Sequence, residues 1–437
     1  MSTVNLPELQ KIIMNLRKNQ SKFAQMEIKR RVSFITRLGN ILERRKHDYA
    51  HLMAIEMGKP VTVGMQEIEK CISLCDYSVN YAQKALTEER GKTHHGVSEV
   101  HYEALGTILN IVPWNYPFWL ALRSAIPTLC AGNAVLIKHS SAVPKCSTAL
   151  DKLFADSGLE DYVRSIQARP EVINQVIEKK LVDGVSVIGS AETGAIVASK
   201  AAAKLIPQVL ELGGSDAFVV FDDADIKLAA QEVIASRMLN SGQNCDSAKR
   251  LFVSAKIARE FEQLLVEEIT KLSIGNPLNP ITAIGPMIDE QSVRRMEGYV
   301  LEAKHKGARL IHGGHKLKRA GFYFMPTILA DCSTEMRVFK EEVFGPILAM
   351  ATFKTEQEAI DMANNTKYGL GASIWTKNKD RIERMTKNLQ VGIIGINKRV
   401  RSDIMLPFGG IKASGYGREL GTLGFRAFTN VKSVSFG

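Results

Sequence analysis

The sequence predicts an α/β fold in which parallel sheets are covered by helices. From about residue 98 onward, short apolar segments typical of strands alternate with helical segments, which is the pattern that parallel sheets produce. Several of these segments are apolar throughout, as expected for strands buried on both faces. A chain of 437 residues, 45% of them hydrophobic, can also bury a large core and divide into two or three lobes.

The elements can be assigned in order along the chain. Residues 1–85 have helical patterning that a glycine and a proline interrupt at "EMGKP" (56–60), and a long helix is expected over about 61–90. The stretch "EVHYEALGTILNIVPWN" then alternates before it becomes continuously apolar, which predicts two strands, the second one buried. Further strands are predicted within 134–140, 181–190 and 208–225.

Composition excludes several classes of protein. No apolar run reaches the roughly 18 to 20 residues that span a bilayer, and the start of the chain has no signal-peptide core. The six cysteines contain no CxxC pair, which argues against structural zinc and against a secreted disulfide scaffold. We therefore expect a cytoplasmic protein with no metal and no membrane contact.

The net charge of +11 raises the question of nucleic-acid binding. Residues 1–50 hold eleven Lys and Arg against four Asp and Glu, on an amphipathic pattern that places Leu9, Ile13 and Leu16 at helical spacing. No nucleic-acid-binding motif accompanies the charge, so a solvated helix face explains it and no nucleic-acid partner is expected. A mitochondrial presequence is the weaker alternative, and Glu8 argues against it.

Three strand ends carry residues suited to ligand binding, because ligands of such sheets bind beyond the carboxyl ends of strands. In "NIVPWNYP" (110–117), two prolines stiffen a turn that carries Asn115, whose amide can donate hydrogen bonds to an oxyanion. In "VIGSAETG" (187–194), Gly189 and Ser190 open a helix whose free N–H groups suit a phosphate, although neither GxGxxG nor a P-loop is present.

The third strand end is "LELGGSD" (210–216), where Glu211 lies beside two glycines. A partly buried carboxylate can have its pKa raised toward neutrality and act as a general base. Taken singly, this glutamate, Asn115 and the helix start at Gly189 each have an ordinary structural explanation.

A cysteine among small and polar residues completes the set. The stretch "SGQNCDSAKR" (241–250) places Cys245 after a glycine turn and before a strand-like segment. A thiol attacks only as the thiolate, so it needs partial exposure and a polar environment, and both are expected here. A free surface cysteine is the alternative. An amide donor, a carboxylate, a nucleotide-type turn and a thiol, each on a loop, together favour an active site.

Eight motifs in their characteristic order resemble the aldehyde dehydrogenase superfamily over nearly the whole chain. They are "EMGKP", "PWNYP", "AGNAVLIKHSS", "GSAETG", "LELGGSD", "GQNC", "EEVFGP" and "LPFGGIKASGYGRELG". The resemblance implies a Rossmann-type cofactor domain (1–85 and 107–213), an α/β catalytic domain (214–420) and a small β oligomerisation flap (86–106 and 421–437). Strands of the flap would pair with a neighbouring subunit in a homodimer or homotetramer.

The resemblance also implies roles for single residues. Cys245 would be the nucleophile, Glu211 the general base that activates water, and Asn115 with the Cys245 backbone N–H the oxyanion donors. Substrate contacts would come from Arg123, Arg401 and Phe408. The NADP or NAD cofactor would be held by Ile111, Val112, Pro113, Trp114, Lys138, Ser140, Ser141, Gly189, Ser190, Gly194, Leu212, Glu342 and Phe344.

Cofactor choice depends on the residues that follow Lys138. Many NAD-dependent members of the family read "KPxE" there, with an acid at the adenosine ribose, whereas this chain reads "KHSS" with Ser141 in that place. A carboxylate repels a 2′-phosphate and a serine does not, so use of both NADP and NAD is predicted.

The substrate inferred from the resemblance is succinate semialdehyde, because the chain is most similar to bacterial NAD(P)-dependent succinate-semialdehyde dehydrogenases. Arg123 lies where those enzymes place an arginine for the substrate carboxylate, and Leu239 lies where some members have a second arginine. Arg237, or Arg399 with Arg401, could replace the second one. Another small or aliphatic aldehyde is the alternative.

Two rival functions and one departure complete the sequence interpretation. An acylating dehydrogenase that uses coenzyme A generally lacks the deacylating glutamate, and a non-catalytic relative would lose the thiol or the base; Glu211 and Cys245 are both present. The family usually begins with a further strand or two, whereas this chain opens in helix, so the cofactor domain is expected to lack an edge strand.

Overall fold

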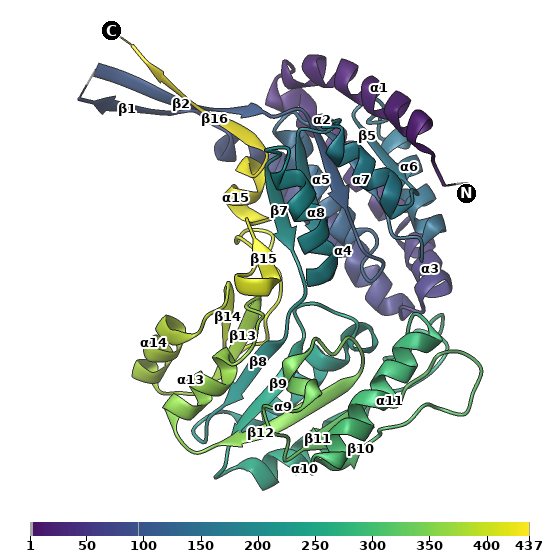
Figure 1. Cartoon of the computed structure of the whole chain (residues 1–437), viewed down its shortest axis with the longest axis vertical. Coiled ribbons are helices and arrows are strands. Elements are labelled where there is room, and N and C mark those ends of the chain that lie inside the picture. Colours follow the sequence, from purple (N-terminus) through teal and green to yellow (C-terminus); the bar gives the residue numbers. More distant parts are fainter. Residues whose placement is uncertain (1–2, 95, 437) are drawn as a thin grey trace.

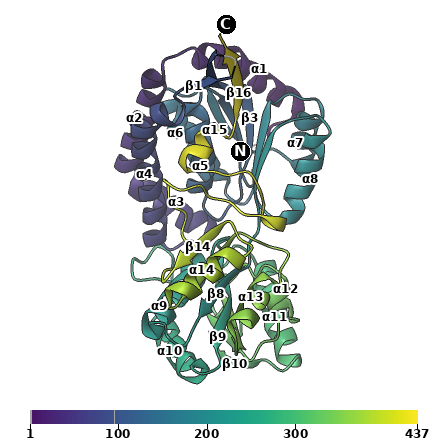
Figure 2. The same cartoon turned by 90° about the vertical axis from the view of Figure 1, so that its left-hand side faces the viewer.

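The computed structural model describes residues 3–94 and 96–436 as two lobes and a projecting arm (Figure 1). Each lobe is built around one sheet with helices on both faces, and the arm is a third sheet (Figure 2). Within the described residues the three sheets have six, seven and three strands. The predicted α/β fold is confirmed.

Four helices precede the first strand, in the region where helical patterning predicted them. Asn5 and Glu8 start the first helix through two reciprocal hydrogen bonds of 3.0 Å between side chain and backbone. Gly58 ends the third helix with a left-handed φ of 74°, and Pro60 precedes the fourth. The fourth helix ends before residue 90, because the chain enters the arm. The helices are α1 (Leu6–Ala24), α2 (Ile28–Arg44), α3 (Lys46–Met57) and α4 (Val61–Ala85).

The basic residues of α1 lie on a solvated face. Leu9, Ile13 and Leu16 are buried in a core that also contains residues of the six-stranded sheet, whereas Lys11 and Lys18 are exposed. The amphipathic explanation of the N-terminal charge is therefore confirmed for this helix.

The first lobe contains the six-stranded sheet, in the order β15-β7-β6-β3-β4-β5. Its strands run parallel except for β15, so the carboxyl ends of the other strands meet at one edge. The strands are β3 (Thr107–Ile111), β4 (Ala134–Lys138), β5 (Val163–Ile166), β6 (Gly184–Ile188), β7 (Gln208–Glu211) and β15 (Gly415–Tyr416). The helices are α5 (Trp119–Cys130), α6 (Pro144–Asp156), α7 (Pro170–Glu178) and α8 (Ala191–Ala202).

The second lobe contains the seven-stranded sheet, in the order β10-β11-β12-β9-β8-β13-β14, parallel except for β10. The strands are β8 (Asp216–Val220), β9 (Ala248–Ser254), β10 (Arg309–His312), β11 (Thr327–Ala330), β12 (Ile347–Phe353), β13 (Gly371–Trp375) and β14 (Ile393–Ile396). The helices are α9 (Ile226–Met238), η1 (Leu239–Gly242), α10 (Ala258–Thr270), α11 (Glu290–His305), α12 (Arg337–Lys340), α13 (Glu356–Asn364), α14 (Lys379–Asn388) and η2 (Lys412–Ser414).

The arm joins two segments that are far apart in the sequence, because its central strand pairs with a strand near the C-terminus. β2 pairs with β16 from Ala104 opposite Thr429 to Ser98 opposite Ser435, and the sheet projects from the first lobe (Figure 1). The strands of the arm are β1 (Glu89–Thr93), β2 (Gly96–Ala104) and β16 (Thr429–Ser435), whereas α15 (Gly421–Arg426), which precedes β16, packs against α4 and α5 of the first lobe.

The domain limits inferred from the resemblance stay a prediction, and one strand crosses them. β15 falls within 214–420, the range expected for the catalytic domain, yet it pairs with β7 of the first lobe through Gly415 and Glu211. No described helix combines the length and apolar composition that crossing a membrane requires.

Candidate active site

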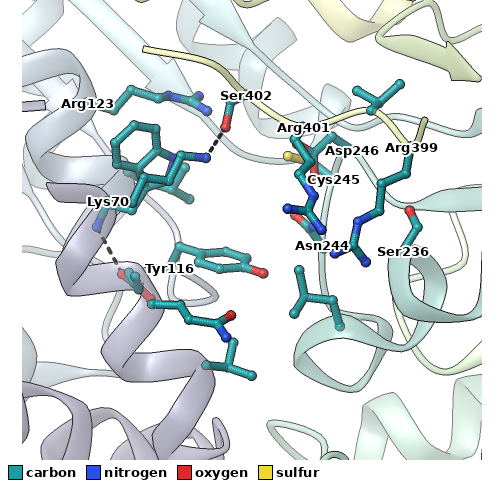
Figure 3. Close-up of a pocket in the computed structure, with 17 residues that line it drawn as sticks. Lys70, Tyr116, Arg123, Ser236, Asn244, Cys245, Asp246, Arg399, Arg401 and Ser402 are labelled. Atoms are coloured by element: carbon teal, nitrogen blue, oxygen red, sulfur yellow. Dashed lines mark hydrogen bonds between the residues drawn. The ribbon is translucent and has the colours of Figure 1, made fainter. Parts of the chain in front are cut away.

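A cavity of about 480 Å³ lies between α4 and α5 on one side and the Cys245 loop on the other (Figure 3). Residues 399–402, which follow β14, complete its wall. Cys245, Arg123 and Arg401 line this cavity, as the sequence interpretation expected for a nucleophile and two substrate contacts. Phe408 is absent from the described residues that line it. It lies behind Arg123 instead, with the guanidinium carbon 4.6 Å from the ring centre.

The backbone before Cys245 adopts an unusual conformation. Asn240, Ser241 and Gly242 have consecutive left-handed φ angles of 53°, 56° and 72°, which strains the two residues that have a Cβ. Gly242 is required for a second reason, because a Cβ there would lie 2.3 Å from the carbonyl oxygen of Gly345. The nucleophile loop is thus pressed against the "EEVFGP" segment.

Arg237 holds this loop in place. It is fully buried, and its guanidinium donates to the carbonyl oxygens of Gly242 at 3.2 Å, Ile347 at 2.6 Å and Val343 at 2.7 Å. Among the described residues it does not line the cavity. The alternative that Arg237 replaces the missing second arginine is therefore not supported, because its donors bind backbone carbonyls and the Ser247 hydroxyl instead.

Cys245 has the partial exposure expected from the sequence, although much of its surroundings is buried. It is partly exposed toward the cavity and packs against the main apolar core of the first lobe. Burial raises the pKa of the Cys245 thiol to about 12, the neighbouring Asp246 raises it further, and Arg123 and Lys249 oppose the rise. The readily ionised thiol expected from the sequence stays a prediction, because burial by residues from other elements opposes its ionisation.

Asn115 lies directly against the nucleophile loop. Its side-chain amide donates to the carbonyl oxygen of Gln243 at 3.1 Å, and its own carbonyl accepts from the amide of Asn240 at 3.0 Å. One N–H of the Asn115 amide remains for another acceptor. The backbone N–H of Cys245 has no hydrogen-bond partner within 3–94 and 96–436. Two donors therefore lie at the nucleophile loop, although Asn115 is not among the described residues that line the cavity.

Glu211 ends β7 in a buried cluster with Arg123 and Glu419. Its Oε1 has no hydrogen-bond partner among the described residues. A Cβ on Gly409 would lie 2.3 Å from this oxygen, so the glycine makes room for it. Burial raises the pKa of Glu211 well above its ordinary range, Arg123 lowers it, and Glu419 raises it. Arg123 donates from Nε to Glu419 at 2.5 Å, so this cation is already paired.

The residues expected at the pyrophosphate lie at the carboxyl ends of β6 and β7. Open space surrounds the position where Gly189 would carry a Cβ, and Ser190 caps α8 by accepting from the N–H of Thr193 at 3.1 Å. A Cβ on Gly194 would lie 2.4 Å from Leu212, so the glycine permits helix and strand to approach. The open backbone at a helix start suits a phosphate.

The adenosine side follows β3 and β4. Ile111 and Val112 are buried, Pro113 and Trp114 are partly exposed, and the partly buried Lys138 is the last residue of β4. Burial lowers the pKa of Lys138, and no hydrogen bond or ion pair satisfies its ammonium among the described residues. Ser140 is partly exposed and Ser141 is exposed, so both remain accessible. These residues fit a dinucleotide.

The "EEVFGP" segment links the expected cofactor site to the nucleophile. Glu342 accepts from the N–H of Gly214 at 3.1 Å and lies 3.6 Å from the ammonium of Lys249. Lys249 in turn donates to the carbonyl oxygen of Cys245 at 2.6 Å. Phe344 meets Trp114 edge to face, with the ring centres 5.9 Å apart. Trp114 and Phe344, which were both predicted to hold the cofactor, are thus in contact.

Sequence reasoning missed several residues of the cavity. Val63, Gln66, Glu67 and Lys70 share one face of α4, and all four line the cavity. Helical spacing could have grouped them, but no motif indicates which partner that face meets. Ser402, Asp246 and Tyr116 also line the cavity without a predicted role. A separate group on the arm, formed by Glu88, Glu99 and His101, is close enough to share an ion.

Comparison with known proteins supports this picture. The family model described as "Aldehyde dehydrogenase family" matches residues 2–434. The chain belongs to the aldehyde dehydrogenase family. It is therefore an oxidoreductase that oxidises aldehydes with NAD or NADP, and the resemblance inferred from the eight motifs is confirmed.

Individual relatives are similar over most of the chain. It is 36% identical to the succinate semialdehyde dehydrogenase (NAD(P)+) Sad of Escherichia coli, covering 91% of this chain and 86% of that one. It is 36% identical to the succinate-semialdehyde dehydrogenase (NADP+) of Deinococcus radiodurans, covering 94% and 87%. The solved NADP+ complex of succinic semialdehyde dehydrogenase from Streptococcus pyogenes has a TM-score of 0.96 and 31% identity, covering 100% and 97%.

Proposed function

We propose that this aldehyde dehydrogenase converts succinate semialdehyde to succinate. The observation that carries the proposal is the cavity beside Cys245, whose wall contains Lys70, Arg123, Arg399 and Arg401. Hydrogen-bonding cations suit a substrate that has a carboxylate at the end opposite its aldehyde. The relatives of Escherichia coli and Deinococcus radiodurans that are named for this substrate support the same choice.

In the proposed mechanism, Cys245 supplies the nucleophile. Its thiolate attacks the aldehyde carbon and forms a thiohemiacetal whose oxygen carries the developing negative charge. The free amide N–H of Asn115 and the backbone N–H of Cys245 stabilise that oxygen, a contribution of about 3 kcal/mol for each donor of this kind. Loss of a hydride from the carbon of the thiohemiacetal leaves a thioester on Cys245, and NAD or NADP, when bound, would supply the hydride acceptor.

Glu211 completes the reaction in this proposal. It activates the water that hydrolyses the thioester on Cys245 and releases the carboxylic acid. Burial raises the pKa of Glu211, so this residue accepts a proton readily. The positive charge of Arg123 lowers the same pKa and so favours loss of that proton, which regenerates the carboxylate. The pair of Arg123 with Glu419 therefore regulates the base rather than acting on the substrate alone.

The proposed cofactors are NADP and NAD. Ser141 is exposed and uncharged at the position expected beside the adenosine ribose, and Lys138 supplies a positive charge nearby in the sequence. A serine tolerates a 2′-phosphate that a carboxylate would repel. Initial rates with both cofactors check this, and a strong preference for NAD contradicts the argument from Ser141.

The proposed assembly is a cytoplasmic homodimer or homotetramer without nucleic-acid partners. The arm supports this proposal, because β1 and β16 are the edges of its three-stranded sheet and offer unpaired backbone groups. Pairing with a neighbouring subunit would satisfy them. The mass in solution, measured by light scattering, tests this part.

The test of the proposed activity is formation of NADPH or NADH from a panel of aldehydes without coenzyme A. Succinate semialdehyde should give the highest kcat/KM, and butanal, which has the same length without the carboxylate, a much lower one. Cys245→Ser should abolish the signal. A higher kcat/KM for butanal or another uncharged aldehyde would replace the proposed substrate. A requirement for coenzyme A would indicate an acylating enzyme.

A further inference from the structure

One wall of the cavity carries polar groups that the proposed mechanism does not use. Lys70 projects from α4 and donates from its ammonium to the hydroxyl of Ser402 at 2.5 Å, which joins α4 to the loop after β14 (Figure 3). The hydroxyl of Tyr116 faces the same cavity, is buried, and has no hydrogen-bond partner among the described residues. A buried unpaired hydroxyl is costly unless a ligand or water satisfies it.

The four cations of the cavity differ in how far their charge is already balanced. Arg123 is paired with the buried Glu419, and Arg399 lies 3.3 Å from Glu232. Lys70 has no carboxylate oxygen within ion-pair distance in the described parts of the chain, and the same is true of the exposed Arg401. The unbalanced positive charge of the wall is therefore at Lys70 and Arg401, not at Arg123.

Lys70 is also held in a defined position. Its ammonium lies 4.3 Å from the ring centre of Trp119, so the aromatic face stabilises the charge from one side. Burial lowers the pKa of Lys70, and the charge of Asp246 opposes this. With one N–H given to Ser402, the ammonium keeps two donors and the serine keeps its own O–H donor. Two carboxylate oxygens could be satisfied by these donors.

We propose that Lys70 and Ser402 form the subsite that binds the carboxylate of a short aldehyde acid and of its dicarboxylate product. This inference rests on the proposed function, and it assigns substrate specificity to a lysine on α4. Tyr116 offers a further donor beside the pair, and Val63, Trp119 and Leu120 provide apolar wall for the methylene groups between the two ends. Arg123 lines the same cavity, but its guanidinium is paired with the buried Glu419.

The test compares Lys70→Met with a matched control, Lys84→Met. Lys84 lies on the same helix outside the cavity, with its ammonium 5.7 Å from the ring centre of Tyr81. Lys70→Met should raise KM for succinate semialdehyde about 10- to 100-fold, the effect of losing a charged hydrogen bond, while kcat/KM for butanal stays within about 2-fold. Lys84→Met should leave both substrates unchanged.

A second readout separates this inference from the proposed function. Succinate should inhibit butanal oxidation by the wild type competitively, and Lys70→Met should weaken that inhibition by the same 10- to 100-fold. Ser402→Ala, which removes one donor and keeps the lysine, should give a smaller loss and serves if Lys70→Met does not fold.

The outcomes are distinct. If the wild type prefers butanal but succinate inhibition still depends on Lys70, the anion subsite stands and the proposed substrate is wrong. If the wild type prefers succinate semialdehyde and Lys70→Met keeps both the preference and the succinate inhibition, the substrate stands and the subsite is overturned. Equal effects of Lys70→Met on butanal and succinate semialdehyde would also overturn it.

Discussion

Arg123 and Glu419 form a buried ion pair, with the guanidinium Nε 2.5 Å from the carboxylate, although the two residues are 296 positions apart. Both lie next to Glu211, whose pKa Arg123 lowers and Glu419 raises. The arginine that motif position assigns to the substrate is thus bound to a second acid of the protein. Its charge acts on the general base as well as on the cavity.

Arg123→Met should therefore impair the oxidation of every aldehyde. The change removes the buried partner of Glu419 and leaves only Arg418 as a cation that lowers the pKa of Glu211, so that pKa rises and the acid limb of the pH–kcat profile moves to higher pH. Breaking a buried pair typically costs about 3 to 5 kcal/mol, so urea unfolding should show a loss of that order. The profile is measured with butanal, which lacks a carboxylate.

Glu419→Gln is the matched variant, and it should move the limb the other way because it removes the charge that raises the pKa of Glu211. If Arg123→Met slows only succinate semialdehyde and leaves the butanal profile unchanged, Arg123 is a substrate ligand and the inferred action on the general base is wrong.

Alkylation of Cys245 should accelerate with pH over the whole accessible range. The pKa of the thiol is raised to about 12, so the free enzyme holds it protonated at neutral pH and the thiolate fraction grows about tenfold with each pH unit below that value. Inactivation by iodoacetamide between pH 7 and 10, without aldehyde or cofactor, should follow this slope. The remaining cysteines are buried, so Cys245 dominates the readout.

Lys249→Met provides the comparison for this experiment. Lys249 lowers the pKa of Cys245, so its removal should slow alkylation at each pH. A rate that reaches a plateau below pH 9 would show that the thiol ionises far more easily than its burial implies.

The location of the site residues could be predicted from the sequence, whereas the pKa of Cys245 could not. The strand ends that carry Asn115 and Glu211 and the loop with Cys245 could be found from local features, because turns, glycines and apolar runs are local. The motifs then fixed the family. The pKa of Cys245 could not be found in this way, because it depends on side chains contributed by α5, β9 and the "EEVFGP" segment.

The substrate wall was less accessible to sequence reasoning for the same reason. Lys70 and Ser402 lie 332 positions apart, and neither belongs to one of the eight motifs. Arg237 was a candidate for the cavity on position alone, yet its guanidinium binds backbone carbonyls of the nucleophile loop and of the loop before β12. Side-chain direction, which separates these cases, is decided by tertiary packing.

Asp216→Asn should stabilise the protein at neutral and alkaline pH. Asp216 is buried in β8 and accepts from the N–H of Gly371 at 3.0 Å, but its second oxygen has no partner among the described residues. Burial raises its pKa to about 7, so the folded state favours the protonated acid and loses stability relative to the unfolded chain as pH rises from about 4 to 7.

The asparagine keeps the acceptor and removes the charge. The gain in Tm over the wild type should therefore be small at pH 5, grow toward pH 7 and stay constant above it. Thermal unfolding at several pH values measures this. A gain that does not vary with pH would mean that Asp216 is ionised throughout and is compensated by Lys249 and Arg250, the neighbouring cations that lower its pKa.

Glu67→Gln should slow catalysis from a distance. Glu67 forms a fully buried ion pair with Lys59, and its Oε1 accepts from the N–H groups of Phe118 and Trp119 at 2.9 Å each, at the start of α5. Lys59 also lies 3.8 Å from the ring centre of Tyr116. Together these contacts fix the turn that carries Asn115.

The glutamine preserves size but leaves Lys59 buried without its counter-charge, at a cost of about 3 to 5 kcal/mol in the free energy of unfolding. Movement of the turn should lower kcat at least tenfold with little change in KM, because an oxyanion donor acts on the transition state. The double variant Lys59→Met with Glu67→Gln removes the uncompensated charge and should recover stability but not kcat. Recovery of both would mean that the pair serves stability alone and that the turn holds Asn115 without it.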